Sequence, residues 1–149
     1  MENLESVKIL LIEDDYGDQK LVKTSLNKQK LANEVFIADS GEDALDYLVS
    51  SKAGEFPMPD LILLDLNMPG MGGKECLRRI KADEELNTIP VIILTTSDSE
   101  QDIIESYKLH ASGYVKKPVT LLGFQEAMRD LEDYWFTVCK RATQVRTYA

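Results

Sequence analysis

The sequence predicts an α/β fold, a three-layer sandwich in which five parallel strands alternate with five helices in a (βα)5 arrangement. Two observations support this prediction: short apolar runs recur along the 149-residue chain, and amphipathic stretches separate them. Three of the runs carry consecutive Ile, Leu and Val residues, as is typical of parallel strands covered on both faces. Right-handed crossovers through the helices join strands of this kind.

Five apolar runs are the expected strands. VKILLI, DLILLD and PVIILT are the most apolar, which favours the centre of the sheet. EVFIA and GYVKK are more mixed in composition, which suits positions nearer the sheet edges. The expected strands cover residues 7–12, 34–38, 60–65, 90–95 and 113–117.

Apolar side chains at helical spacing indicate the five helices. Ser40 and Asp43 match a capping-box pattern at the start of the second helix, and Ser97 or Ser99 precedes the fourth. We expect the last helix to extend to about residue 140 and a short polar tail to follow, with residues 1–149 forming a single domain. The expected helices cover 18–31, a stretch from 40, 73–83, a stretch after 97 or 99 that carries Ile103, Ile104 and Tyr107, and about 120–140.

Composition limits the classes of function. The chain is 44% hydrophobic and 29% charged, as expected of one globular domain. Its formal net charge of −9 argues against nucleic acid as a partner, because phosphate binding needs clustered Lys and Arg. The sequence shows no signal peptide and no apolar run that could span a bilayer, so we expect a cytoplasmic protein with no membrane partner. Two separated cysteines and one histidine do not supply a zinc site.

Side chains that can carry chemistry follow four of the five expected strands at the same end. Glu13 and Asp14 follow the first strand, and Asp65 ends the third. Thr95 ends the fourth strand and Lys117 ends the fifth. In open parallel sheets, ligands bind outside the carboxyl ends of the strands. The sequence therefore predicts that acids, a hydroxyl and a lysine meet at this edge.

Crowded carboxylates at that edge indicate a bound cation. Two carboxylates about 4 Å apart repel by roughly 1–4 kcal/mol at effective dielectrics between water and a protein surface. Ligands that are all oxygen suit a hard cation such as Mg²⁺. For any one acid, a helix cap or a solvated loop residue is an adequate interpretation. The whole set favours phosphoryl transfer to a carboxylate, with Asp65 as the nucleophile and with Mg²⁺ and Lys117 screening charge.

Four motifs resemble those of response-regulator receiver domains in two-component signalling. They are ILLIEDD, LLDLNMPGMGG, PVIILTTS and GYVKKP, and the likeness covers residues 6 to about 132. The resemblance implies a flavodoxin-like fold with the strand order 2-1-3-4-5. It also implies a signalling module rather than an enzyme, with magnesium-dependent self-phosphorylation and slow self-dephosphorylation as its chemistry.

The resemblance also implies roles for the residues at the sheet edge. Asp65 is the expected phosphoryl acceptor. Asp14, Asp65 and the backbone carbonyl of Asn67 are the expected Mg²⁺ ligands, and Glu13 helps through water.

Further roles carried over by resemblance concern the response to phosphorylation. Lys117 and Thr95 contact the phosphoryl group, and Thr95 with Tyr114 forms the switch. The family pattern also implies a cis peptide between Lys117 and Pro118.

A closer likeness is to stand-alone regulators of phytochrome-type histidine kinases. The long loop at 51–60 and the segment DYWFTV at 133–138 carry it, and no output domain follows in this sequence. The likeness implies a phytochrome-type sensor kinase as the partner. Three adjacent aromatic residues, Tyr134, Trp135 and Phe136, cannot all face one core, so we expect a homodimer through the fourth helix, fifth strand and fifth helix. The alternative is that this extra turn folds back on its own domain.

Three other interpretations compete with this one. An aspartate-dependent hydrolase commonly needs a second acid two residues after its nucleophile, where this chain has Asn67. A degenerate receiver that acts only as a protein-interaction module is disfavoured by the intact Asp14, Asp65, Thr95 and Lys117 set. A flavin or nucleotide binder would be expected to have a Gly-rich phosphate turn after the first strand, which is absent here.

Overall fold

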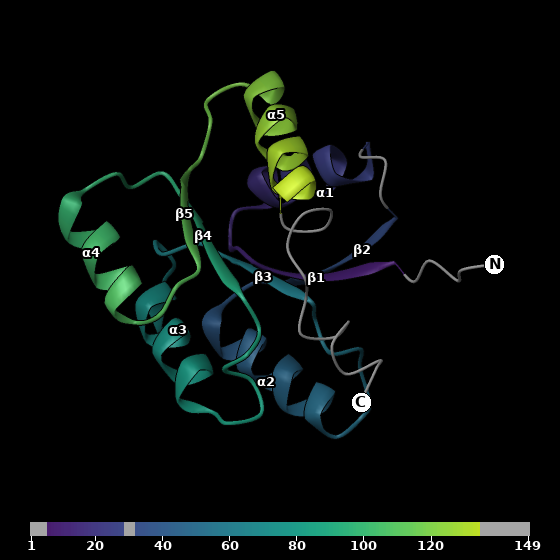
Figure 1. Ribbon diagram of the computed structural model, residues 1–149, viewed down its shortest axis with the longest axis vertical. Coiled ribbons are helices and arrows are strands. Elements are labelled where there is room, and N and C mark those ends of the chain that lie inside the picture. Colours follow the sequence, from purple (N-terminus) through teal and green to yellow (C-terminus); the bar gives the residue numbers. More distant parts are fainter. Residues whose placement is uncertain (1–5, 29–31, 135–149) are drawn as a thin grey trace.

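The computed structural model describes residues 6–28 and 32–134, which form the expected (βα)5 sandwich (Figure 1). The five strands pair in parallel in the order β2-β1-β3-β4-β5, which confirms the predicted fold class and strand order. The strands are β1 (Val7–Ile12), β2 (Asn33–Ala38), β3 (Leu61–Leu64), β4 (Val91–Thr95) and β5 (Gly113–Lys116). The helices are α1 (Tyr16–Asn27), α2 (Gly41–Lys52), α3 (Gly72–Ala82), α4 (Glu100–Lys108) and α5 (Leu121–Leu131).

Alternation along the strands divides the core into two layers. Leu10 and Ile12 of β1 pack with side chains of α2 and α3, whereas Ile9 and Leu11 pack with those of α1 and α5. Figure 1 shows α1 and α5 on one side of the sheet and α2, α3 and α4 on the other. The central strands β1, β3 and β4 are almost entirely buried, while the edge strands β2 and β5 are only partly buried. This partial burial explains why the sequences of β2 and β5 mix polar and apolar residues.

Short polar side chains determine where four helices begin. Asp15, Ser40, Ser99 and Thr120 each accept a hydrogen bond from the backbone N–H three residues later. The bond to Ser40 confirms the predicted start of α2, and Ser99 rather than Ser97 caps α4. Helix α1 begins at Tyr16, earlier than predicted, because Asp15 is its cap.

Helix α4 leaves apolar side chains exposed that the sequence pattern predicted to face the core. Ser106 is its buried residue, whereas Ile104 and Tyr107 are 52% and 48% exposed. An exposed apolar surface therefore accompanies the helix that follows β4.

The C-terminal region is described in part. Helix α5 ends at Leu131, and residues 132–134 continue as a wider π-helical turn in which Tyr134 is 56% exposed. Trp135, Phe136 and the rest of the helix predicted to reach about residue 140 lie outside the described residues. The helix length and the single-domain organisation of 1–149 stay predictions. Within the described ranges, no helix combines the length and apolar character that crossing a bilayer requires.

Candidate functional site

The carboxyl ends of β1 and β3 bring three carboxylates together. These strands are neighbours, with Ile12 beside Leu64, so the residues that follow them are adjacent. The Asp65 N–H extends the pairing by donating to the Ile12 carbonyl at 3.0 Å. Glu13, Asp14 and Asp65 each place a carboxylate oxygen within 4.8 Å of the other two. Glu13 and Asp65 are buried while Asp14 is exposed, so the cluster is open to solvent on one side.

Lys117 enters this cluster from the end of β5. Its backbone N–H donates to the Thr95 carbonyl at 2.7 Å, which extends the pairing of β4 with β5. Its buried Nζ donates to Asp18 Oδ2 at 2.8 Å and to Asp65 Oδ2 at 3.4 Å. It also donates to Glu13 Oε1. One ammonium group therefore faces three carboxylates.

Burial and charge determine the proton affinity of these groups. Burial raises the pKa of Glu13 to about 7, although the hydrogen bond from Lys117 acts to lower it. Burial acts to lower the pKa of Lys117, but the hydrogen bonds to Asp18 and Glu13 outweigh it and leave this pKa above its ordinary value. The lysine is therefore charged at neutral pH, whereas ionising Glu13 is costly because its carboxylate is buried. A cation held by the carboxylates would relieve that cost.

The end of β4 supplies a buried hydroxyl. Thr95 Oγ1 accepts hydrogen bonds from Asn67 Nδ2 at 3.4 Å and from the Ser97 N–H at 3.5 Å. Both distances are long, so the bonds are weak. The Asn67 N–H in turn donates to Asp65 Oδ1 at 3.3 Å. The Thr95 hydroxyl is thus connected to Asp65 through Asn67, and only weak hydrogen bonds fix its orientation.

Tyr114 on β5 is connected to α4 through the loop after β4. The half-buried Tyr114 donates its hydroxyl to the Ser97 carbonyl at 2.8 Å. Ser97 Oγ donates to Asp102 in the first turn of α4, and Asp102 pairs with Lys74 of α3. A change at Ser97 can therefore reach both Tyr114 and α4.

Two glycines shape the loop that carries Asp65 into α3. Gly72 has a φ of +77°, a left-handed conformation that favours glycine. At Gly73, a Cβ atom would lie 2.2 Å from the Asp65 carbonyl oxygen. Helix α3 therefore begins directly against Asp65, where a larger residue would displace the loop.

Residues 9–129 match the family described as response regulator receiver domain. The chain belongs to this family. It is 39% identical over 130 residues to response regulator Rcp1 of Synechocystis sp., covering 85% of this chain and 87% of that protein. It is 35% identical over 123 residues to chemotaxis protein CheY-3 of Vibrio cholerae, covering 83% of this chain and 89% of that protein.

Solved structures of other receiver domains share the fold. The phosphorylated cyanobacterial phytochrome response regulator RcpA has a TM-score of 0.87 at 35% identity, covering 93% of this chain and 99% of that one. The bacteriophytochrome response regulator AtBRR has a TM-score of 0.71 at 40% identity, covering 91% and 99%. The Mn²⁺-bound form of response regulator Rcp1 has a TM-score of 0.82 at 36% identity, covering 91% and 98%.

Membership of the receiver family is consistent with a divalent cation at the acid cluster. Receiver domains are generally signalling modules of two-component systems rather than enzymes. The Mn²⁺-bound Rcp1 structure shows a related protein with a divalent cation. In this receiver domain the carboxylate oxygens of Glu13, Asp14 and Asp65 lie within 4.8 Å of one another. Burial makes the ionised form of Glu13 costly. The residues therefore fit a hard divalent cation such as Mg²⁺.

One expectation about the site is wrong. We expected a cis peptide between Lys117 and Pro118, but every peptide bond among the described residues is trans. An X–Pro bond prefers trans by only about 0.5–1 kcal/mol, so a proline in the sequence does not determine the isomer. In this receiver domain Lys117 contacts its carboxylate partners with the trans bond.

Two residues of α1 belong to the site but are not among the predicted site residues. Asp18 contacts Lys117, and Gln19 Nε2 donates to the Glu13 carbonyl at 2.6 Å and to Asp39 Oδ1 at 2.7 Å. In the sequence they are simply the first residues of the expected helix. A signal was available in Asp15, because an Asp cap at this position makes residue 18 part of the first turn, next to the end of β1.

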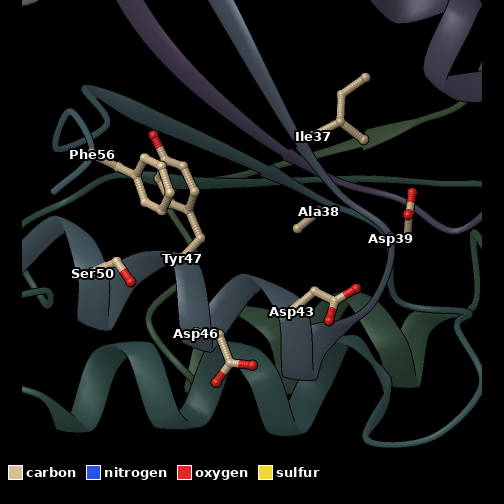
Figure 2. Close-up of a pocket in the computed structure, with 8 residues that line it drawn as sticks. All are labelled: Ile37, Ala38, Asp39, Asp43, Asp46, Tyr47, Ser50 and Phe56. Carbon is tan, nitrogen blue, oxygen red and sulfur yellow. The ribbon is translucent and has the colours of Figure 1, made fainter.

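A separate hollow of about 320 Å³ lies between β2 and α2 (Figure 2). The rings of Tyr47 and Phe56 stack at one end of it with centroids 5.1 Å apart. Asp39 and Asp43 lie toward the other end (Figure 2). Since Asp39 accepts from Gln19, the hollow borders the acid site without containing any of the predicted site residues.

Proposed function

We propose that the chain is a response regulator that accepts a phosphoryl group on Asp65 from a sensor histidine kinase and then switches a protein-binding surface. One observation carries this proposal: the buried Asp65 carboxylate has Lys117 Nζ at 3.4 Å and the Glu13 and Asp14 carboxylates beside it. A nucleophilic carboxylate, a fixed cation and ligands for a divalent ion are the groups that phosphoryl transfer to aspartate requires.

The transfer exchanges one bond to phosphorus for another. An Asp65 oxygen attacks the phosphorus of a phosphohistidine in line, and the new O–P bond forms as the N–P bond breaks. The histidine nitrogen keeps the electron pair and takes up a proton. Lys117 stabilises the charge on the transferred oxygens. Glu13, Asp14, Asp65 and the Asn67 carbonyl would hold Mg²⁺, which supplies further positive charge.

Thr95 and Tyr114 form the proposed switch. The weak bonds to Thr95 Oγ1 allow its hydroxyl to turn and donate to a phosphoryl oxygen on Asp65. That turn removes the contact with Ser97, whose carbonyl accepts from the Tyr114 hydroxyl at 2.8 Å. Tyr114 then rotates inward and the surface of α4 and β5 changes. Phosphorylation must favour the second arrangement, because a group with equal affinity for both states shifts neither.

The proposed kinase is of the phytochrome type. Support comes from the names of related proteins, among them the phytochrome response regulator RcpA and the bacteriophytochrome response regulator AtBRR. The pairing would be tested by mixing purified kinase, labelled with phosphate on its histidine, with the purified regulator and following transfer of the label to Asp65. A cytoplasmic location and the lack of a nucleic-acid partner stay predictions.

We also propose a homodimer through α4, β5 and α5, with Tyr134, Trp135 and Phe136 in the interface. The support is that Ile104, Tyr107 and Leu122 are large, apolar and exposed on these elements, and that β5 is an edge strand. Light scattering at high concentration, with and without beryllofluoride as a phosphoryl analogue, should give the mass of two chains in at least one state. Ile104→Lys should reduce dimerisation, and Val49→Lys on α2 is the matched control. A monomer under both conditions contradicts the proposal.

The acceptor assignment is tested by intact mass after incubation with acetyl phosphate and Mg²⁺. We expect one phosphoryl adduct on the wild type and none on Asp65→Asn. Asp46→Asn, which changes an exposed acid on α2, is the matched control and should label like the wild type. Labelling of Asp65→Asn at the wild-type level would overturn the assignment. A wild type that takes no label would favour the receiver that acts only by binding proteins.

A further inference from the structure

The ammonium group of Lys117 has a partner that the proposed phosphoryl transfer does not use. Asp18, in the first turn of α1, places Oδ2 at 2.8 Å from Lys117 Nζ, closer than Asp65 Oδ2 at 3.4 Å. Together with Glu13, these two acids occupy all three N–H donors of the lysine. A phosphoryl oxygen on Asp65 therefore cannot bind Lys117 unless one of these bonds is given up.

We propose that Asp18 is a positioning residue that competes with Asp65 for Lys117 and so sets how strongly the site holds a phosphoryl group. This inference rests on the proposed function. In the resting state Asp18 holds the lysine toward α1. When a phosphoryl group is present, Lys117 gives up the Asp18 bond and donates to the phosphoryl oxygen instead.

The burial of the three partners indicates which bond is released. The side chains of Glu13 and Asp65 are 2% and 6% exposed, whereas that of Asp18 is 25% exposed. Water can replace Lys117 at Asp18, but it cannot readily do so at the two buried acids. Of the two acids that are not phosphorylated, Asp18 is therefore the one whose bond to Lys117 costs less to lose.

Helix α1 holds Asp18 in place for this role. The Asp18 N–H donates to the capping Asp15 at 3.2 Å, and α1 buries Val22 and Leu26 against the sheet. The Asp18 carboxylate consequently remains near Lys117 whether or not the bond between them is made. Its negative charge favours a cation in the site and opposes a phosphoryl anion.

The test is Asp18→Asn in the full chain, with two affinities measured that should move in opposite directions. Calorimetric titration gives the affinity for Mg²⁺, and ¹⁹F NMR at saturating Mg²⁺ gives the affinity for beryllofluoride. Removing one nearby charge should weaken Mg²⁺ binding by about fivefold and tighten beryllofluoride binding by about fivefold. Asp18→Glu keeps the charge and should return the Mg²⁺ affinity toward the wild-type value.

The matched control is Asp43→Asn, which changes the equivalent first-turn acid of α2 without touching a residue that contacts Lys117. It should change neither affinity by more than about twofold, because its charge is screened by solvent. Unchanged affinities in Asp18→Asn, or a loss of both, would overturn the inference, since a purely structural role weakens both. If the wild type takes no label from acetyl phosphate, the proposed function fails. If the wild type is labelled but Asp18→Asn leaves both the Mg²⁺ and the beryllofluoride affinity unchanged, only the proposed role of Asp18 fails.

Discussion

Helices α1 and α4 both follow strands that end at the acid site, yet they are attached to the sheet in different ways. Helix α1 buries Gln19, Val22, Ser25 and Leu26. Helix α4 buries Ser106, and its apolar residues Ile104 and Tyr107 are about half exposed. The helix next to Lys117 is thus anchored by more buried side chains than the helix next to Ser97.

Two ion pairs link α4 to α3. Lys74 of α3 pairs with Asp102 and Glu105 of α4, and all three side chains are partly exposed. Such pairs are typically worth about 0–1 kcal/mol each. Helix α4 can therefore shift at a small cost in free energy, while α1 keeps Asp18 and Gln19 in fixed positions. This difference suits a protein whose chemistry needs fixed geometry and whose proposed output surface needs to move.

The largest expected effect is a difference in stability between matched substitutions on α1 and α4. Leu26→Ala removes a fully buried side chain from the layer beneath α1, and the free energy of unfolding should fall by about 2–5 kcal/mol from lost burial and the cavity left behind. Ile104→Ala is the matched change on α4 and should alter that free energy by less than about 0.5 kcal/mol. Urea denaturation of both variants gives the two values. Equal losses would show that α4 is as firmly packed as α1.

The apolar runs were sufficient to predict five parallel strands, whereas the strand order was predicted from the resemblance to receiver domains. Glu13, Asp65, Thr95 and Lys117 follow apolar runs whose parallel pairing alone brings them to one edge. The exposure of Ile104, by contrast, depends on how closely α4 approaches the sheet. Helical spacing of apolar residues indicates which face turns inward, but it carries no information on that distance.

The sequence was less informative about the groups around Lys117. Asp18 lies in the first turn of α1, capped by Asp15, and its contact with Lys117 depends on how that turn approaches the sheet edge. The Lys117–Pro118 isomer is likewise not determined by the residues, since the intrinsic preference for trans is only about 0.5–1 kcal/mol. Contacts that depend on the direction in which a helix enters, or on a small energy difference, could not be predicted from the residues alone.

The buried carboxyl group of Glu13 makes the stability of the protein depend on pH. The pKa of Glu13 is raised from 4.5 to about 7, so the folded protein binds more protons than the unfolded chain between these values. Stability contributed by protonated Glu13 is present below about pH 4.5 and is lost as the pH rises to about 7. Between pH 5 and pH 7.5 the loss is on the order of 2–3 kcal/mol in the metal-free protein. Urea denaturation near pH 5 and pH 7.5 in EDTA measures it.

Glu13→Gln is the control for this pH dependence, because its amide oxygen can still accept hydrogen bonds without becoming charged. Its stability should be nearly constant over the same pH range. Adding Mg²⁺ to the wild type above pH 7 should restore most of the lost stability, since a cation offsets the ionised Glu13. A wild type and a Glu13→Gln variant with the same pH profile would show that Glu13 does not ionise in this range.

The smallest expected effect has the opposite sign and concerns α4 alone. Ser106 Oγ is buried and has no hydrogen-bond partner among the described residues. An unsatisfied buried hydroxyl costs about 1–3 kcal/mol, so Ser106→Ala should raise the free energy of unfolding by up to about 1 kcal/mol and slow hydrogen exchange in α4. Ser51→Ala on α2 is the contrasting control, because Ser51 Oγ donates to the Tyr47 carbonyl at 3.1 Å, and its loss should destabilise the protein. If both variants are destabilised, Ser106 has a partner in solution, and α4 is held more firmly than its described contacts with α3 imply.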